Sequence, residues 1–297
     1  MQNIITSETL TGRHTAYVIN APEIAMKAEP GQLVMVRSNY WPGPIPHAIA
    51  DYDRDKGTVT IVVRTPRFEE TRVGDAIVEP GDTGSQSPVG PSTEAVLSRD
   101  PGSSEHPPLS GDNASFELTG PLGRPGRTET TGKIVCVTKG SGVAALFPRL
   151  RQYKEKGWYT IVIAGYSNKD DIFWAERLDR HSDELYVVTD DGSFGIKGPV
   201  RQTLKAVCEH TNDIDQVFAV GSLKLLKISS DITRNYMIPT LISLNAVLDG
   251  EDSRVADAVV TNGEAPSDFD WNQAADLDGH MQDFDELTHK LGIQIAK

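Results

Sequence analysis

The fold is decided by the stretch Gly132-Lys133-Ile134-Val135-Cys136-Val137-Thr138-Lys139-Gly140-Ser141-Gly142-Val143-Ala144-Ala145-Leu146-Phe147. Four apolar residues, Ile134 to Val137, predict a buried strand, and Gly140 and Gly142 indicate a turn after it. Apolar residues then recur at helical spacing as far as Gly157, which predicts a helix. A strand, a glycine turn and a helix in this order favour an anion, because glycine lets backbone approach a phosphate and the helix N-terminus offers unpaired N–H groups.

The glycine turn supports two interpretations that the local sequence leaves open. Gly140 to Ala145 fits the pattern G-x-G-x-x-G/A of dinucleotide-binding folds in the correct strand-to-helix context. That fingerprint also requires an acidic residue about 20 positions further on, at the end of the next strand. Here the next predicted strand, Trp158 to Ala164, is followed by no carboxylate before Asp170. The alternative is a tight turn of any α/β domain.

Length, charge and cysteine content limit the class of protein. A chain of 297 residues is long enough for two domains. The net charge of -13 argues against nucleic acid or an anionic membrane surface as a partner, and fits a solvated surface. Cys136 and Cys208 are the two cysteines, and neither has a metal-ligand partner at motif spacing, so we expect a reducing compartment without disulfides. With no signal peptide and no membrane-spanning run, we expect a cytoplasmic protein without membrane insertion.

The first part of the chain predicts a small antiparallel barrel. Short β-rich runs separated by turn signals are typical of that architecture. The predicted strands are Ile4-Ile5, Thr15 to Ile19, Gln32 to Arg37, Thr58 to Arg64 and Ala114 to Leu118. Between the last two, residues 84–113 are rich in Ser, Pro, Gly, Asp and Glu, which indicates a solvated insertion. We therefore place a barrel domain at residues 1–130, with the insertion at 84–113.

The second part predicts a parallel α/β domain at residues 131–245. Strands and helices alternate, which means right-handed βαβ units and a sheet covered on both faces. The predicted strands are Ile134–Val137, Tyr159–Ala164, Glu184–Thr189, Gln216–Val220 and Thr240–Leu244, and the predicted helices are Val143–Lys156, Ile172–Arg180, Pro199–Glu209 and Ser222–Asn235. Ligands of such sheets bind beyond the carboxyl ends of the strands. Three predicted loops converge there: Gly140–Gly142, Thr189–Gly195 and Gly221-Ser222.

We expect the acidic residues 246–297, which follow the two predicted domains, to form a small C-terminal tail. Val255 to Val260 suits a short strand, and Phe284, Leu287 and Leu291 suit one closing amphipathic helix.

Several motifs along the chain together point to one family. They are Pro30-Gly31-Gln32-Leu33-Val34, Ile49-Ala50-Asp51-Tyr52-Asp53, Gly120-Pro121-Leu122-Gly123, Phe173-Trp174, Asp183-Glu184-Leu185-Tyr186, Thr189-Asp190-Asp191-Gly192-Ser193-Phe194-Gly195, Ser243-Leu244-Asn245, Asp278-Gly279-His280 and Asp283-Phe284-Asp285-Glu286-Leu287. With them, the chain resembles the ferredoxin–NADP reductase-like electron-transfer subunits. These include the small subunits of NADH-dependent ferredoxin–NADP oxidoreductase and of sulfide dehydrogenase, and the electron-transfer subunit of dihydroorotate dehydrogenase.

The resemblance implies a flavin-type barrel with FAD, a parallel domain with NAD(P)H, and a tail with a [2Fe–2S] cluster. It also implies a larger flavoprotein or iron–sulfur oxidoreductase subunit as partner. No side-chain acid, base or nucleophile is expected, because the cofactors carry the chemistry. The cofactor-binding residues that it implies on the barrel are Pro46, Ala48, Ile49, Asp51, Tyr52, Gly120 and Leu122. Those that it implies on the parallel domain are Gly140, Ser141, Gly142, Val143, Asp190, Asp191, Gly192, Gly221 and Ser222.

The cluster site departs most from the family. The family has cysteines near the positions of Arg254, Asp257 and Trp271, and iron–sulfur clusters require thiolates. We therefore predict that this chain carries no [2Fe–2S] cluster.

The flavin site departs in part. In the family pattern R-x-P-L/F-T/S, the arginine neutralises the FAD pyrophosphate and the hydroxyl binds the isoalloxazine; here Pro44 and Ala48 stand at these positions. Glu69 and Glu70 would repel a diphosphate, whereas Arg67 or Arg72 could replace the lost charge. Whether FAD is retained stays open.

The nucleotide site departs least. A family glycine is replaced by Lys139, which could hinder a phosphate or pair with it. The arginine that the family often carries near Ser167 is absent, so NAD(H) is favoured over NADP(H). Two functions remain: an electron-transfer subunit that links NAD(P)H, FAD and a partner, or a subunit of such a complex that has lost its cofactors and serves a structural or regulatory role. A third, weaker alternative is a bare nucleotide sensor.

Overall fold

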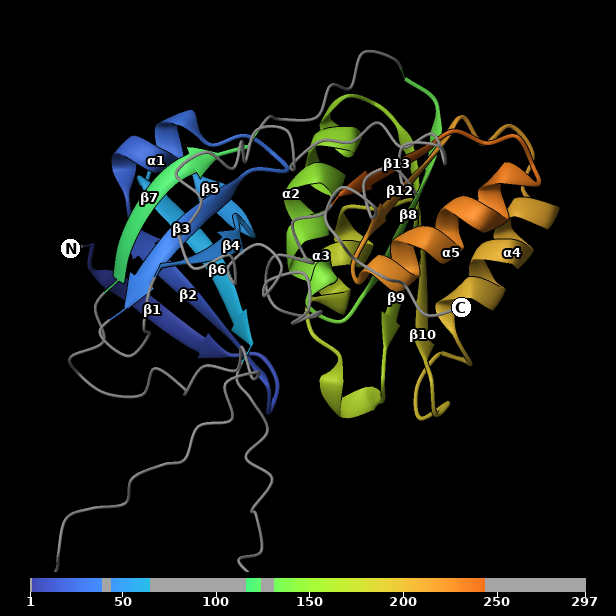
Figure 1. Cartoon of the computed structure of the whole chain (residues 1–297), viewed down its shortest axis with the longest axis horizontal. Coiled ribbons are helices and arrows are strands. Elements are labelled where there is room, and N and C mark those ends of the chain that lie inside the picture. Colours follow the sequence, from blue (N-terminus) through green and yellow to red (C-terminus); the bar gives the residue numbers. More distant parts are fainter. Residues whose placement is uncertain (1, 39–43, 65–115, 124–130, 244–297) are drawn as a thin grey trace, which may run out of the picture.

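The computed structural model describes residues 2–38, 44–64, 116–123 and 131–243. These residues form an antiparallel β-barrel-like part beside a parallel α/β part, as expected (Figure 1). The predicted boundaries at 130 and 245, the insertion at 84–113 and the acidic tail with its strand and helix all lie outside the described residues.

Two antiparallel sheets make up the first part. One sheet has the order β1-β2-β6-β5 and the other β4-β3-β7. The strand bounds are β1 Ile4–Thr9, β2 His14–Asn20, β3 Leu33–Ser38, β4 Ile45–Ala48, β5 Asp51–Asp53, β6 Thr58–Arg64 and β7 Phe116–Leu122. Alternate residues of these strands, among them Ile19, Val34 and Ile61, fill the barrel core, as a period of two requires when one face of a sheet is buried.

Helix α1 (Pro22–Lys27) and strands β4 and β5 were not predicted from the sequence. Proline at the first turn suits the start of α1, because its missing N–H would have no intrahelical partner there. The helix has only six residues, too few for an apolar repeat to reveal it. Gly57, at φ 64°, lets the β5–β6 turn approach Pro22, because a Cβ there would lie 2.9 Å from the proline Cβ.

The second part is a six-stranded parallel sheet of order β11-β10-β9-β8-β12-β13. The strand bounds are β8 Lys133–Lys139, β9 Tyr159–Tyr166, β10 Glu184–Thr189, β11 Ile196–Lys197, β12 Gln216–Val220 and β13 Thr240–Ser243. The helix bounds are α2 Gly142–Glu155, α3 Ala175–Arg180, α4 Val200–His210 and α5 Leu223–Arg234, with a 3₁₀ turn η1 at Lys169–Asp171. The predicted alternation is confirmed. The helix predicted from Ile172 begins at Ala175, and the two-residue strand β11 was missed.

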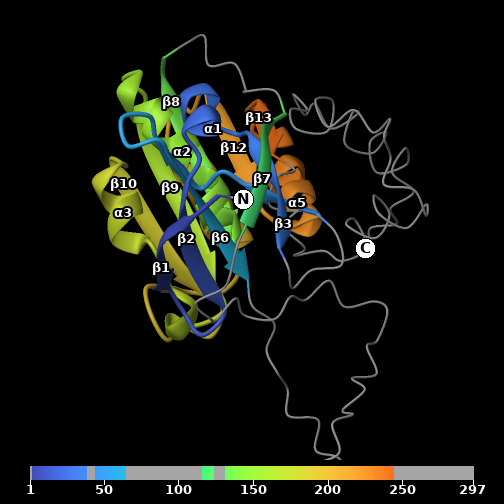
Figure 2. The same cartoon turned by 90° about the vertical axis from the view of Figure 1, so that its left-hand side faces the viewer.

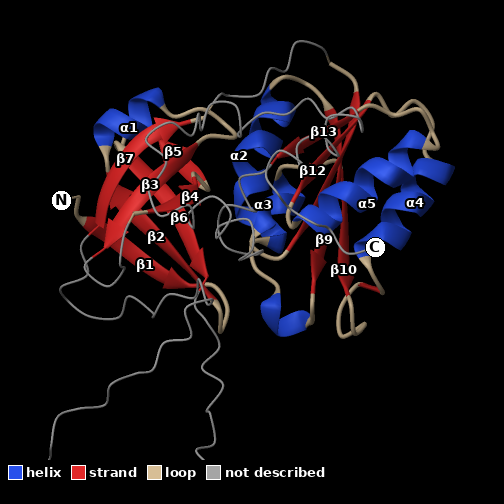
Figure 3. Ribbon diagram, in the orientation of Figure 1, coloured by secondary structure: helices blue, strands red, loops and turns tan. Residues whose placement is uncertain are grey.

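Helices cover both faces of this sheet. Helices α2 and α3 lie on the side of the barrel, and α4 and α5 cover the other face (Figures 1 and 3). Two core clusters correspond to these faces: one gathers Leu146, Phe147 and Leu150 of α2, and the other gathers residues of α4 with Leu225 of α5. The side view places the barrel strands against the α2 face (Figure 2).

The two parts share one apolar core. Ala16, Ala48, Ala50 and Val62 of the barrel belong to the same buried cluster as Phe147 of α2. Burial of apolar surface is the main favourable contribution to such a contact. The carboxyl edge of the parallel sheet is therefore held at a fixed place relative to the barrel.

Candidate functional site at the carboxyl edge of the parallel sheet

The strand order reverses between β8 and β12. The chain runs from β8 outward to β9 and β10, and then returns to β12 on the other side of β8. A reversal of this kind leaves a crevice at the carboxyl ends of the two strands, where ligands of open α/β sheets bind. The loop Gly140–Gly142 follows β8, and Gly221-Ser222 follows β12. Two of the three loops that the sequence predicted to converge therefore meet at the switch point.

Close approach explains the glycine at position 142. A Cβ there would lie 2.6 Å from Thr138 Oγ1 and 2.8 Å from the carbonyl oxygen of Val220. Because the second neighbour is backbone, a side chain at 142 would push the two loops apart. Gly140 and Gly221 have φ values of 60° and 153°, where a side chain is strained. The crevice thus depends on all three glycines.

Helix α2 starts at this turn. Gly142 is its first residue, and the buried Ser141 is its N-cap. Thr138, fully buried at the end of β8, has a hydroxyl without a hydrogen-bond partner among the described residues. A buried polar atom without a partner costs free energy. The α2 N-terminus at this turn offers backbone N–H groups to a phosphate, so this edge fits NAD(P)H.

A cavity of about 250 Å³ opens beside the turn, between the sheet edge and the barrel. Its lining residues are Arg13, His14, Arg64, Lys139, Gly140, Tyr166, Ser167, Asp171 and Ser222. Gly140 and Ser222 are predicted site residues; Ser141, Gly142, Val143 and Gly221 adjoin them in the chain. The Ser222 hydroxyl caps α5 by accepting a hydrogen bond from the N–H of Leu225 at 3.4 Å.

Lys139 pairs with a predicted site residue. Its Nζ donates to Oδ2 of Asp190 at 2.7 Å, and both side chains are about 40 % exposed (39 % and 42 %). Asp191 instead accepts hydrogen bonds from the backbone N–H and hydroxyl of Ser193, and these bonds lower the pKa of its carboxyl. Gly192, at φ 78°, closes this turn. Lys139 and Asp190 thus balance each other's charge at the rim.

None of the barrel residues that the resemblance implies for cofactor binding lines the cavity beside the glycine turn. Ile49 is in the barrel core, and Ala48 is buried in the core shared with α2. Asp51 binds Arg151 and Arg177 of the α/β part. Tyr52 lies beneath the guanidinium groups of Arg54 and Arg151, which are 5.3 and 5.1 Å from its ring centroid.

Pro46, Gly120 and Leu122 complete that set. Pro46 pairs with Met35 on β3, and Leu122 with Leu33. Gly120 lines a separate hollow beside α1. Among the described residues, neither the 44–48 segment nor β7 contains a lysine or an arginine, and Ala48 is 5% exposed. The described barrel therefore lacks the arginine and the hydroxyl that the resemblance implies for FAD at positions 44 and 48, and positions 65–72, where Arg67 and Arg72 stand, lie outside the described residues.

Sequence reasoning missed the basic side of the cavity. Arg13 precedes β2, His14 is its first residue, and Arg64 ends β6, where the antiparallel register pairs His14 with Arg64. The sequence indicates that these residues lie at strand ends. It does not indicate that they face the glycine turn, because that depends on how the barrel packs against the α/β part.

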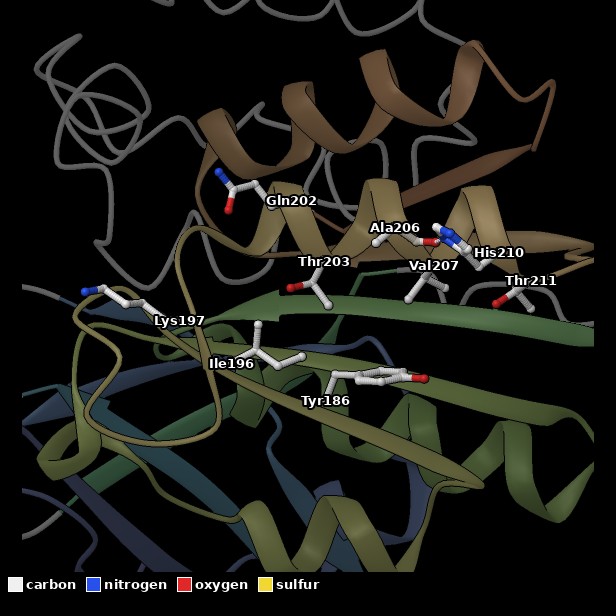
Figure 4. Close-up of a pocket in the computed structure, with 9 residues that line it drawn as sticks. All are labelled: Tyr186, Ile196, Lys197, Gln202, Thr203, Ala206, Val207, His210 and Thr211. Carbon is white, nitrogen blue, oxygen red and sulfur yellow. Dashed lines mark hydrogen bonds between the residues drawn. The ribbon is translucent and has the colours of Figure 1, made fainter.

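A second hollow, of about 400 Å³, lies on the α4 side of the sheet and is mostly apolar (Figure 4). It is lined by Tyr186, Ile196, Lys197, Gln202, Thr203, Ala206, Val207, His210 and Thr211. None of the predicted site residues lines it. The described residues contain no group of His, Cys, Asp and Glu side chains suited to a metal ion, and no described helix is long and apolar enough to span a bilayer.

A barrel packed against a parallel sheet with a glycine turn at its switch point defines the class of ferredoxin reductase-like proteins. Among solved structures, the NADH-dependent reduced ferredoxin–NADP oxidoreductase, studied for flavin-based electron bifurcation, matches with a TM-score of 0.61 and 25% identity. The match covers 82% of this chain and 76% of that one. The ferredoxin reductase of carbazole 1,9a-dioxygenase has the same fold, with a TM-score of 0.58, 15% identity, and coverage of 81% and 67%.

Sequence relatives identify the family. A protein of Clostridium beijerinckii, described only as uncharacterized in the adh 3′ region, is 30% identical over 99% of this chain and 90% of its own. The dihydroorotate dehydrogenase B electron transfer subunit homolog of Thermotoga maritima is 27% identical over 92% of this chain and 84% of its own. No model of a known protein family matches the chain. The chain belongs to the ferredoxin–NADP reductase-like electron-transfer subunits, which are components of oxidoreductases.

Proposed function

We propose that this chain binds NADH at the switch point of its parallel sheet and passes electrons, by way of FAD, to a larger flavoprotein or iron–sulfur subunit. The observation that supports the NADH site is the direct packing of the loops at Gly142 and Gly221, which places the α2 N-terminus beside a cavity facing the barrel. Bound NADH would supply the reducing equivalents. The chain's own residues would bind, orient and shield the nucleotide.

The charges at the rim support NADH over NADPH. Asp170 and Asp171 follow β9, and Asp190 and Asp191 follow β10. Carboxylates near the adenosine end of a nucleotide would repel a 2′-phosphate. Lys139, the cation that ends β8, is already paired with Asp190.

One observation favours the second function, that of a structural or regulatory subunit without cofactors. Ala48, at the position where the family places a flavin-binding hydroxyl, is 5% exposed and packed within the core shared with α2. An apolar contact there would hold the two parts together without a flavin.

Two measurements on the purified full-length chain separate these functions. We expect calorimetry to detect NADH binding that is at least tenfold tighter than NADPH binding. The visible spectrum then decides the role of FAD: flavin absorption that NADH bleaches supports electron transfer through this chain, and a colourless protein that still copurifies with its partner supports the structural role. Absence of NADH binding to a folded, flavin-loaded chain would contradict the NADH proposal.

A further inference from the structure

The cavity beside the glycine turn receives basic side chains from the barrel. Arg13 lies just before β2, His14 is the first residue of β2, and Arg64 is the last residue of β6. They face Lys139 and Gly140 across the boundary between the two parts. The cavity therefore combines a basic wall from one part with a nucleotide-type turn from the other.

The hydrogen bonds of Thr11 fix the proton on His14. Thr11 Oγ1 accepts from the backbone N–H groups of Arg13 and His14, both at 3.1 Å. A hydroxyl oxygen has two lone pairs and one hydrogen. With both lone pairs used, the hydroxyl donates to Nδ1 of His14 at 3.0 Å. The neutral ring therefore carries its hydrogen on Nε2.

That Nε2–H group has no partner in the part of the chain that the structure describes. His14 is 5% exposed, and its ring lies 4.9 Å from the ring of Phe173, measured between centroids. Burial, followed by the charges of Arg64 and Arg13, lowers the pKa of His14 to about 4. The imidazole is thus a neutral donor at physiological pH, and His14 is one of the residues that line the cavity.

The remaining charges make the cavity basic. Nε of Arg13 is also buried without a partner among the described residues. The acidic group in the lining is Asp171, whose Oδ2 accepts a hydrogen bond from Asn168 at 3.1 Å. The positive charge of Lys139 is partly balanced by its ion pair with Asp190. Donors and cations therefore outnumber acceptors, which is the arrangement that binds an oxyanion.

We propose that this cavity is an oxyanion subsite in which His14 Nε2–H, Arg13 and Arg64 bind one phosphoryl group from the barrel side. Two ligands could supply this phosphoryl group: the diphosphate of a bound dinucleotide, or free phosphate. The first of these rests on the proposed function. At about 250 Å³, the cavity holds only part of a dinucleotide, since pockets for whole ligands are larger. A ligand bound here contacts both parts of the chain.

The test uses the full chain, with NADH, inorganic diphosphate and inorganic phosphate as probes in calorimetry. His14→Phe removes the donor and keeps a ring beside Phe173, His14→Gln keeps an amide N–H near the position of Nε2, and His210→Phe is the matched control at an exposed histidine on α4. A hydrogen bond to a charged group typically changes binding by about 10- to 100-fold. We expect His14→Phe to weaken NADH and diphosphate binding by at least tenfold. His14→Gln is expected to stay within about threefold of wild type, and His210→Phe to change nothing.

The outcomes distinguish the source of the anion and the two proposals. If His14→Phe weakens both NADH and diphosphate binding, the subsite takes the dinucleotide; if it weakens only the inorganic anions, the subsite takes free phosphate. If wild type binds diphosphate in a His14-dependent manner but not NADH, the subsite stands and the proposed function fails. If NADH binds wild type and His14→Phe equally, and neither inorganic anion depends on His14, the subsite is overturned and the NADH proposal stands. If no probe binds the wild type, the subsite is also overturned.

A measurement on the wild type keeps the test independent of variant folding. Nitrogen NMR of the His14 ring, assigned by comparison with His14→Gln, should show a neutral ring with the proton on Nε2. Addition of inorganic diphosphate should shift that nitrogen. A ring protonated on Nδ1, or one unaffected by saturating diphosphate, would overturn the proposal.

Discussion

The carboxylate of Asp51 on β5 accepts a hydrogen bond from the guanidinium of Arg177 on α3, with Oδ2 and Nη2 2.5 Å apart. Its other oxygen accepts from Arg151 on α2 at 2.8 Å. Arg177 also stacks over Phe147 and Trp174, with 4.2 and 4.3 Å to the ring centroids. One barrel carboxylate thus binds two helices of the α/β part. The resemblance implied that Asp51 binds a cofactor, whereas in this structure its carboxylate connects the two parts of the chain.

Asp51→Asn should destabilise the contact between the two parts. Both arginines would keep a neutral acceptor but lose their counter-charge, and hydrogen bonds to charged groups contribute about 1.5–3 kcal/mol each. We expect the free energy of unfolding to fall by about 1–3 kcal/mol in urea denaturation. Glu117→Gln is the control, because Glu117 is exposed and 3.9 Å from Arg37, and exposed pairs contribute about 0–1 kcal/mol. Equal effects of the two substitutions would contradict the role of Asp51.

Gly142→Ala should remove nucleotide binding and lower stability. The new methyl group would meet the backbone of Val220 at 2.8 Å, and such overpacking typically costs about 1–3 kcal/mol. Gly12→Ala is the matched control, since no atom lies within 4 Å of a Cβ there. Thermal unfolding and NADH calorimetry on both variants provide the measurement. Unchanged NADH affinity in Gly142→Ala would argue against the switch-point site.

Lys139 and Asp190 should affect NADH binding in opposite directions. Asp190→Asn frees the Lys139 ammonium for a phosphate, so binding should tighten by about two- to fivefold, as expected for a partly exposed charge. Lys139→Ala should weaken binding by a similar factor, and both effects should shrink at high salt. Arg201→Ala, on the exposed side of α4, is the control for the loss of a cation. Weaker binding in Asp190→Asn would show that the carboxylate itself contacts the nucleotide.

His14 should make the protein less stable in mild acid. Its folded-state pKa of about 4 lies below the ordinary value of 6.5, so the unfolded chain binds the proton first. The stabilising contribution is therefore complete above pH 6.5 and is lost as the pH falls towards 4, by up to about 3 kcal/mol. Urea denaturation at several pH values should show a flatter profile for His14→Gln than for wild type. His210→Gln should leave the profile unchanged; equal profiles for wild type and His14→Gln would contradict the burial effect.

The tail should carry no iron. Arg254, Asp257 and Trp271 stand near the positions of the family's cluster cysteines, and cluster ligation requires thiolates. Iron and acid-labile sulfide assays on the chain purified without oxygen should find neither in stoichiometric amount. One cluster per chain would contradict this prediction.

The sequence predicts the parallel part well because its signals are local. Strands of such sheets contain continuous apolar runs, here 185–188 and 217–220, so β10 Glu184–Thr189 and β12 Gln216–Val220 agree with their predicted bounds. Helix α2 deviates by one residue at each end. The short elements α1, β4, β5 and β11 were missed, because two to six residues carry too little periodicity.

The site was predictable only on one side. Gly140, Gly142 and Gly221 mark backbone turns, which a sequence motif records directly. The opposite wall consists of Arg13, His14 and Arg64, whose role depends on a long-range packing arrangement. No local pattern encodes which residues of one domain will face the loops of another.

Helix α2 also limits how this chain can exchange parts with its relatives. Its buried Arg149 presses against the barrel turn, where a Cβ on Gly31 would lie 2.7 Å from Nη2, and the same helix begins at the glycine turn. A chimera that replaces the barrel alone would remove the turn at Gly31, where the absence of a side chain leaves space for the Arg149 guanidinium. A chimera should therefore take the barrel and the barrel-facing side of α2 from the same parent protein. We also expect substitutions in the barrel turn and in this side of α2 to accompany one another during evolution.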